Sequence, residues 1–229
     1  MSLSFHFHGH GTYTLEVDGV RLLVDPFFTG NPTADVTADT VEADVILVTH
    51  GHGDHTGDLV AVAKRLNVLV ISNFEIAEWL AGQGVANTHG GNLGGGYRHS
   101  FGYLKLTLAH HTSGLPDGSY GGNPAGFLLR TDRYRVYLAG DTALFGDMQL
   151  LAEENLDLAV LPIGDNFTMG PDDALRAASW IKARHYIPVH YDTWPPIAQD
   201  GPAWCRRVEA QTGARAFPLK PGETWTLSA

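Results

Sequence analysis

Residues 49–55 read Thr-His-Gly-His-Gly-Asp-His and directly follow the apolar run Val45-Ile46-Leu47-Val48. Three histidines and one aspartate thus place four metal-capable side chains at the end of an expected strand. Imidazole and carboxylate groups bind borderline divalent ions such as zinc, and a loop held by rigid elements can turn several of them toward one point. The alternative is a surface loop that happens to be rich in histidine. We predict a metal site here.

The chain has 229 residues, of which 44% are hydrophobic and 17% charged, a composition typical of a globular protein. This length suits one domain, so we expect residues 1–229 to form a single unit. The formal net charge of −10 argues against a general nucleic-acid binder, although a local basic patch is compatible with an acidic total. We expect a small-molecule partner and no nucleic acid.

The sequence also predicts a compartment. No basic segment followed by a long apolar stretch opens the chain, and no run approaches the ~18 apolar residues that suggest a membrane span. Cys205 is the only cysteine, which excludes an intramolecular disulfide and suits a reducing compartment. Its neighbours indicate a surface-to-core helix more than the surroundings of a nucleophile. We expect a cytoplasmic protein that does not contact a membrane.

Short strand-like runs alternate with helical ones along the chain. The expected strands are residues 4–8, 13–17, 20–25, 44–49, 68–71, 104–110, 125–130, 135–139, 156–161, 186–189 and 223–227. The expected helices are residues 58–66, with Thr56 as the N-cap, 75–81, 172–183 and 203–212. A hairpin at Asp18-Gly19 and a flexible loop over residues 90–96 complete the outline. Such a mixture predicts two face-to-face sheets with helices outside.

Further metal-capable side chains follow three later strands. His110 and His111 come after residues 104–109, Asp141 follows another apolar run, and His190 follows the strand near the end of the chain. A lone polar residue in such a place is commonly just a hydrogen-bonded side chain, but three added to the first motif favour a shared site. The set has the chemistry for two metal ions.

In order and spacing, these residues resemble the ligand series of the metallo-β-lactamase superfamily. More closely, the chain resembles a largely uncharacterised branch of metal-dependent hydrolases, similar to the L-ascorbate-6-phosphate lactonases. The segments that carry this resemblance are His8-Gly9-His10, Asp25-Pro26-Phe27, Ala139-Gly140-Asp141-Thr142, residues 162–170 and Pro188-Val189-His190-Tyr191. The resemblance runs from His8 to the C-terminus. It implies a four-layer αββα sandwich, an α+β fold with two mixed sheets inside and the site at one edge between them.

The resemblance also implies a role for each ligand. The first ion would be bound by His50, His52 and His111, the second by Asp54, His55 and His190, with Asp141 bridging the two. His111 is preferred over His110 because the pattern places its histidine directly before a small hydroxyl residue, here Thr112; a shift of one residue would exchange the two. Zinc is the expected metal, with manganese, iron or nickel as alternatives that such ligands also accept.

Two ions held in this way would share a hydroxide that attacks a carbonyl or phosphoryl group. Asp141, as the bridge, and Asp54, which could orient the hydroxide or pass a proton to the leaving group, are the expected catalytic residues. No motif for a serine or cysteine nucleophile is present.

Four further residues are expected to bind substrate or support the ligands. His8 and His10 face the same side if their segment is still strand; alternatively they are buried histidines bonded to backbone. Asp25 could accept a hydrogen bond from a ligand imidazole and so fix its tautomer. Asn166 could donate to a carbonyl or anionic oxygen, although a purely structural turn fits its segment equally well.

The leading hypothesis is a dinuclear hydrolase that attacks a lactone, ester or amide carbonyl of a small metabolite, an anionic one included. The alternatives are a phosphodiesterase, acting on a small phosphodiester or nucleic acid, and a metal-binding module with little turnover. The β-lactamases, the RNA-cleaving and transfer-RNA-processing branches and the glyoxalase-type thioesterases carry signals, insertions, arms or domains that this sequence lacks. The substrate, a lid over residues 113–123 and assembly into a homo-oligomer stay open.

Overall fold

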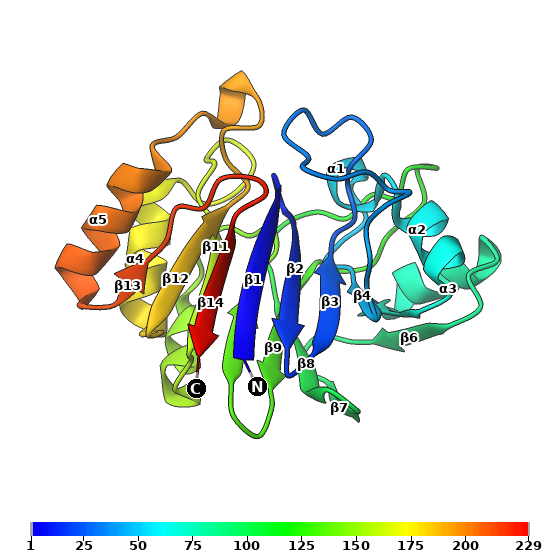
Figure 1. The fold of residues 1–229 in the computed structure, drawn as a ribbon, viewed down its shortest axis with the longest axis horizontal. Coiled ribbons are helices and arrows are strands. Elements are labelled where there is room, and N and C mark those ends of the chain that lie inside the picture. The colour runs from blue at the N-terminus through cyan, green and yellow to red at the C-terminus, as the bar shows by residue number, and fades with distance from the viewer. Residues whose placement is uncertain (1, 229) are drawn as a thin grey trace.

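The computed structural model describes residues 2–228, which form two seven-stranded sheets packed face to face (Figure 1). The first sheet contains β1 (Ser2–Gly9), β2 (Thr12–Val17), β3 (Val20–Val24), β4 (Val45–Leu47), β5 (Leu69–Asn73), β6 (Thr88–Gly91) and β14 (Thr224–Ser228). The second contains β7 (Gly96–His99), β8 (Gly102–Leu108), β9 (Ala125–Arg130), β10 (Arg135–Leu138), β11 (Leu158–Pro162), β12 (His185–Val189) and β13 (Arg215–Ala216).

Helices lie on the outer faces of both sheets. They are α1 (Gly53–Thr56), α2 (Leu59–Leu66), α3 (Phe74–Gly82), α4 (Pro171–Ile181) and α5 (Gly201–Thr212), with 3-10 helices η1 (Gly146–Glu154) and η2 (Pro195–Ile197). Figure 1 shows α2 and α3 on one side of the molecule and α4 and α5 on the other. No helix within residues 2–228 is long and apolar enough to cross a membrane.

Three apolar layers follow from the alternation of side chains along the strands. In β1, Leu3, Phe5 and Phe7 point inward and join a core between the two sheets. A second core lies between α4, α5 and the second sheet, and a third lies between α2, α3 and the first sheet. Helix, sheet, sheet and helix therefore stack in four layers, which confirms the predicted αββα sandwich.

Each sheet is mixed, and its strand directions explain where loops gather. The strands from β14 to β3 pair antiparallel, whereas β3 to β6 pair parallel. The second sheet repeats this pattern, antiparallel from β7 to β10 and parallel from β10 to β13. Strands separated by two antiparallel pairings run in the same direction, and parallel pairing keeps that direction. In the first sheet β1, β3 and β4 therefore run in one direction, and in the second sheet β8, β10, β11 and β12 share one direction. The loops after these strands carry the polar residues singled out above.

The prediction of a flexible loop over residues 90–96 is wrong at both ends of that segment. Residues 88–91 form β6 and residues 96–99 form β7, which are the edge strands of the two sheets. A backbone ladder needs no side chains, so β5 and β8 hold these glycines in strands despite their low intrinsic preference. At Gly96 the space for a side chain is already filled by Tyr103, which explains why glycine fits this edge.

Other local expectations meet different outcomes. Thr56 is not the N-cap of α2: it lies in α1, where its hydroxyl donates to the carbonyl oxygens of Gly51 and His52. The hairpin at Asp18-Gly19 joins β2 to β3 as expected, with both residues at positive φ. Sequence patterns missed η1, η2 and β13, which are short or lack helical periodicity.

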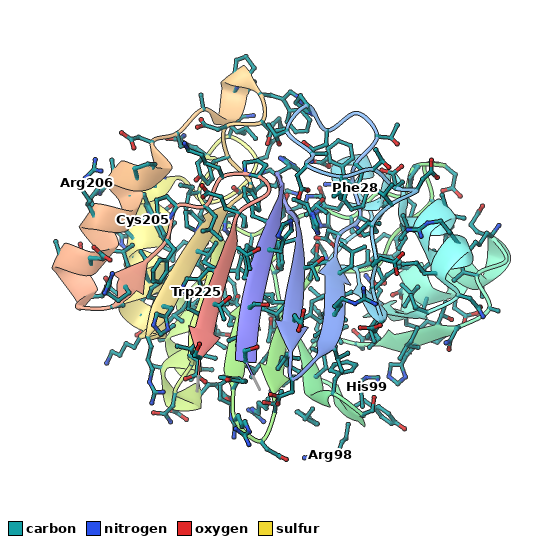
Figure 2. The ribbon with its side chains drawn as sticks, in the orientation of Figure 1. Phe28, Arg98, His99, Cys205, Arg206 and Trp225 are labelled. Atoms are coloured by element: carbon teal, nitrogen blue, oxygen red, sulfur yellow. The ribbon has the colours of Figure 1, made fainter. Side chains whose placement is uncertain are left out.

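Cys205 lies on α5 and is buried (Figure 2). Burial raises the pKa of its thiol to about 12, so the thiolate that a nucleophile needs is disfavoured. This placement agrees with the expected surface-to-core helix.

Candidate metal centre

Three imidazoles meet beyond the end of β4. The loop that carries His50 and His52 is held in place because the Gly51 amide donates to Ser113 Oγ at 3.0 Å. His50 Nε2 lies 3.1 Å from His52 Nδ1, and His111 Nε2, beyond β8, lies 3.3 Å from that same atom. The first expected set of ligands therefore converges from two sheets.

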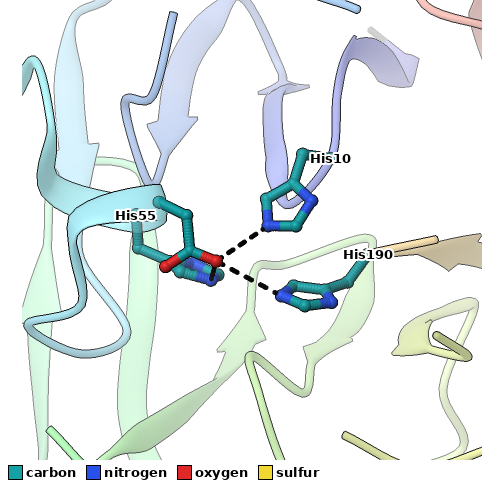
Figure 3. A group of neighbouring side chains, drawn as sticks. His10, His55 and His190 are labelled. Atoms are coloured by element: carbon teal, nitrogen blue, oxygen red, sulfur yellow. Dashed lines mark hydrogen bonds and ion pairs between the residues drawn. The ribbon is translucent and has the colours of Figure 1, made fainter. Parts of the chain in front are cut away.

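A second group surrounds the carboxylate of Asp54 in α1. Asp54 Oδ2 lies 3.0 Å from His10 Nε2, 3.7 Å from His190 Nε2 and 3.8 Å from His55 Nε2. Figure 3 shows His10, His55 and His190 arranged around this carboxylate. His55 and His190 are the expected partners of Asp54; His10 is an addition.

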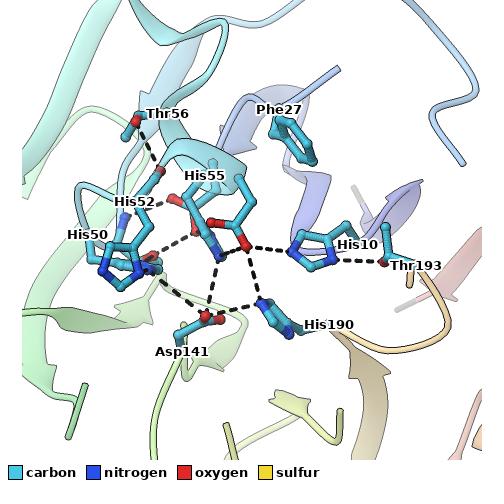
Figure 4. A network of polar contacts seen from close by, with 12 residues as sticks. His10, Phe27, His50, His52, His55, Thr56, Asp141, His190 and Thr193 are labelled. Carbon is cyan, nitrogen blue, oxygen red and sulfur yellow. Dashed lines mark hydrogen bonds and ion pairs between the residues drawn. The ribbon is translucent and has the colours of Figure 1, made fainter. Parts of the chain in front are cut away.

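Asp141 joins the two groups. It follows β10 through Gly140, whose φ of +63° makes the turn and whose place leaves no room for a side chain against Thr49. Its Oδ2 atom lies near four histidine Nε2 atoms, 3.0 Å from His190, 3.4 Å from His55, 3.6 Å from His111 and 3.9 Å from His50 (Figure 4). One oxygen thus faces both groups, the position that a bridging ligand requires.

The charges at this point are strongly coupled. Burial alone would raise the pKa of Asp141, but the charges of His190 and His55 outweigh it and hold that pKa well below its usual range. In turn Asp141 overcomes the effect of burial on His190 and raises its pKa to about 9. Burial, with His55 nearby, lowers the pKa of His50 well below its usual value. Positive charge is therefore favoured beside Asp141.

The donor atoms fit divalent cations. Within the part of the chain that the structure describes, His55 Nε2 and both ring nitrogens of His190 are buried without a hydrogen-bond partner. Such atoms are rare in folded proteins, since losing water without a replacement is costly. Imidazole nitrogens and carboxylate oxygens that converge on shared points are the donors that zinc and similar ions bind.

Asp25, at the end of β3, holds the first motif from behind. Its carboxylate accepts hydrogen bonds from His55 Nδ1 at 2.8 Å, from the Thr49 amide at 2.8 Å and from the Thr49 hydroxyl at 2.6 Å. Thr49 Oγ1 is also 3.0 Å from His50 Nδ1. Both rings therefore have their Nδ1 atoms occupied and turn Nε2 toward Asp141, as expected of a residue that fixes a ligand tautomer.

His10 and His8 separate in space, contrary to the expectation that they face one side. The ladder between β1 and β2 shifts register between Phe7 and Gly9, and Gly9 and His10 both have positive φ, which breaks the alternation. His10 is buried, with Nε2 on Asp54 and Nδ1 2.7 Å from the Thr193 hydroxyl. His8 instead bonds Asp35 and Thr14, away from Asp54 and Asp141.

His111, not His110, lies in the cluster. His110 is exposed and its ring stacks on Phe145 at 4.8 Å. Of the two neighbours, only His111 lies beside His52 and Asp141, and its role as a ligand stays a prediction.

A cavity of about 620 Å³ opens over the cluster. Asn166, in the loop after β11, lines it, as do several ligand candidates. The segment 113–123, considered as a lid, contributes none of the lining residues. Instead the Ser113 hydroxyl donates to the Gly121 carbonyl oxygen and accepts from the Gly51 amide in the loop of the first motif. The remaining walls are Thr112, Phe167, Trp194 and Pro196.

Sequence reasoning missed Thr49, Thr193 and Trp194, and for Phe167 it offered only that its segment could line the pocket. Thr49 directly precedes His50, the first ligand candidate, so its position at the end of a strand could have indicated a supporting role. The other three follow β11 and β12 at positions that the backbone alone decides. Asp165 and Asn166 have left-handed φ values of 63° and 52°, a conformation that no periodicity predicts.

Comparison with known proteins identifies the family. A family model described as the beta-lactamase superfamily domain matches residues 20–191. The UPF0173 metal-dependent hydrolase of Thermus thermophilus is 49% identical over 219 residues, covering 96% of both chains. That of Geobacillus thermodenitrificans is 48% identical over 230 residues, covering 98% of this chain and 100% of its own.

A solved structure is also similar along its full length. Igni18, a metallo hydrolase of the archaeon Ignicoccus hospitalis, superposes with a TM-score of 0.91 at 33% identity and covers 100% of both chains. With the αββα sandwich and the histidine and aspartate cluster between its sheets, these matches show that the chain belongs to the metallo-β-lactamase superfamily and, within it, to the UPF0173 metal-dependent hydrolases.

Proposed function

We propose that the protein is a hydrolase with two divalent metal ions, zinc first and manganese, iron or nickel as alternatives, that cleaves a lactone, ester or amide of a small molecule. The observation that carries this proposal is the position of Asp141 Oδ2 within 3.9 Å of four histidine nitrogens from both groups. The first ion would be held by His50, His52 and His111 and the second by Asp54, His55 and His190, with Asp141 shared. When bound, two such ions supply Lewis acidity and turn water into a nucleophile near neutral pH.

The chain itself supplies orientation. Asp25 and Thr49 hold the rings of His55 and His50 from the side opposite their Nε2 atoms. His10, anchored by Thr193, donates from Nε2 to Asp54 and so orients that carboxylate. Preset ligand directions reduce the reorganisation that binding and reaction would otherwise require.

Asp54 is placed to move a proton. Its side chain is 31% exposed and lines the cavity. Burial would raise its pKa, but the hydrogen bond from His10 and the nearby imidazoles of His190 and His55 outweigh that effect and lower it well below the usual value. The carboxylate is therefore ionised at neutral pH, and from the cavity wall it can orient the attacking water and relay its proton to the leaving group without retaining it.

The test is metal counting beside a substrate screen. We expect about two equivalents of metal in the purified parent and a clear loss in Asp141→Ala. Asp39→Ala, at an exposed aspartate that belongs to none of the groups of metal-capable side chains, should keep both. Metal-dependent hydrolysis of an ester or lactone, abolished by chelation, supports the proposal. Cleavage of phosphodiesters alone would favour the phosphodiesterase alternative, and turnover of nothing would favour a binding module.

A further inference from the structure

Several of the residues that line the cavity are not metal-ligand candidates. Beyond the ligand candidates it is lined by Thr112, Asn166, Phe167, Trp194 and Pro196. Thr112 Oγ1 lies 3.2 Å from His52 Nε2 and is already engaged. The other four are not ligand candidates, and Trp194 also packs on His10. They surround the place where a substrate must lie.

Phe167 is held outward by its backbone. It follows Asp165 and Asn166, both in the left-handed region, and its side chain is 56% exposed. The loop is tied to the turn after Asp141, because the Met169 amide donates to the Thr142 carbonyl oxygen at 2.9 Å. Asp and Asn adopt this conformation more readily than other non-glycine residues, so the loop holds the Phe167 ring at the cavity wall without a large cost in backbone strain.

Trp194 is placed by its neighbours. Its ring meets His10 edge-on at 4.7 Å and lies 6.2 Å from Phe27. Pro195 and Pro196 follow at once and begin η2, which limits how far the backbone can move. An indole and a proline ring therefore form a stiff apolar wall, and flat apolar groups bind such walls well.

Beyond the ligand candidates, the described residues in the walls of this cavity carry no charged side chain. Within residues 2–228, no lysine or arginine lines it. Arginines elsewhere pair with carboxylates, such as Arg21 with Asp44 and Arg130 with Glu154. Figure 2 shows Arg98 and Arg206 at the periphery, away from the loops that form the cavity. A carboxylate or phosphate remote from the reacting bond would lose water there without gaining a cationic partner.

From these walls we propose that the substrate is neutral and carries a flat apolar or aromatic ring beside the scissile carbonyl, held by Phe167, Trp194 and Pro196. This inference rests on the proposed hydrolase function and narrows it. Asn166 adds an uncharged amide that can donate to a neutral oxygen of the same molecule. The anionic metabolite considered from the sequence, and a phosphorylated lactone in particular, does not match this cavity.

The experiment compares matched lactones on the metal-loaded protein. The probes are 3,4-dihydrocoumarin, its ring-carboxylated derivative, and the aliphatic δ-valerolactone. We expect the neutral aromatic lactone to have the highest kcat/KM. In Phe167→Ala and Trp194→Ala its advantage over δ-valerolactone should fall about tenfold, chiefly through KM, since the lost contact is apolar and aromatic. Leu150→Ala, an equally exposed apolar residue outside this cavity, should leave the ratio as in the parent.

Adding a positive charge to the cavity gives a second check. Phe167→Arg should raise the kcat/KM of the carboxylated lactone relative to the neutral one, because it supplies the missing cation. Equal or better turnover of the carboxylated lactone by the parent would overturn the inference while leaving the hydrolase function intact. So would an equal loss for all three lactones in the alanine variants.

A measurement of ligand binding tests this inference without requiring that the protein hydrolyse anything. Chroman, which lacks the carbonyl, and its carboxylate should be titrated calorimetrically into the parent and Phe167→Ala. Chroman binding that weakens in the variant and exceeds that of the carboxylate supports the inference even if no lactone is hydrolysed, a result that would sink only the hydrolase proposal. Stronger binding of the carboxylate, or no chroman binding, would overturn it.

Discussion

Asp25 is the residue on which the first motif rests, although it touches no cavity. It is buried, and its two oxygens accept from the amide and hydroxyl of Thr49 and from the ring of His55. We predict that Asp25→Asn weakens the affinity of the second metal ion by about 10- to 100-fold, because an amide cannot accept all these bonds and frees the His55 ring. Elemental analysis after dialysis against buffered zinc measures this, with Asp39→Asn as the matched control. Retention of both ions at parental affinity would contradict the positioning role.

At the scale of elements, the long connection between β3 and β4 is tied to β1 beside the site. His6 Nε2 and His8 Nδ1 each lie 2.7 Å from a different oxygen of Asp35. The far ring nitrogens of His6 and His8 are 2.7 Å from the Thr224 hydroxyl and 2.8 Å from the Thr14 hydroxyl. Both ring nitrogens of each histidine and both carboxylate oxygens of Asp35 thus have a partner. This cluster of His6, His8 and Asp35 therefore anchors the loop that carries Phe27.

This anchor makes stability depend on pH. Burial lowers the pKa of His8 below its ordinary 6.5 despite the Asp35 hydrogen bond. The unfolded chain therefore binds more protons below about pH 6.5, and the free energy of unfolding should fall as pH drops through that range, by at most ~1.4 kcal/mol per pH unit for one group. Denaturant titrations of the metal-free protein at about pH 7 and 5 measure the fall, which should be shallower in His8→Gln. Parallel pH profiles for the two proteins would exclude this origin.

The turn after β10 is the second element-scale feature. Gly140 has a φ of +63°, and an added Cβ would lie 3.0 Å from the Ala125 carbonyl oxygen and from Thr49. We predict that Gly140→Ala destabilises the fold by ~1–3 kcal/mol and lowers metal affinity, since the strain displaces Asp141. Thermal unfolding and metal counting test this, and Gly146→Ala, where a side chain meets only open space, serves as control. A Gly140→Ala protein with parental stability and metal content would contradict the argument.

For the whole molecule, metal binding should stabilise the pairing of the two sheets. His50 and Asp54 follow the first sheet, whereas His111, Asp141 and His190 follow the second, so ions held by both groups join the sandwich at one edge. We predict that zinc at about 100 times its Kd raises the free energy of unfolding by about 2.7 kcal/mol per site and raises Tm accordingly. The rise should disappear with chelator and shrink in Asp141→Ala. A Tm independent of metal would show that the ions contribute no stability to the fold.

Much of the fold and of the cluster of histidines and aspartates could be predicted because local sequence patterns indicate both. Apolar runs of strand length and the histidine-rich loop after β4 identify themselves by composition and spacing, and the order of His111, Asp141 and His190 supported the resemblance. The edge strands β6 and β7 escaped because their glycines have no side-chain pattern, and partner strands alone decide their state. His8 was misplaced because the positive φ values of Gly9 and His10 turn only His10 toward Asp54, whereas His8 keeps the strand alternation and faces Asp35 beside His6.

The sequence by itself determined most of the strands and helices and the identity of the residues around Asp141, since periodicity and residue chemistry are local properties. Only the tertiary structure decided that Asp25 and Thr49 hold the ligand rings, that His10 faces Asp54, and that Phe167 and Trp194 line a cavity without lysine or arginine. The physical reason is that these relations join segments up to 183 residues apart, as His10 and Thr193 are. They depend on strand direction and on left-handed backbone positions that no spacing along the chain expresses.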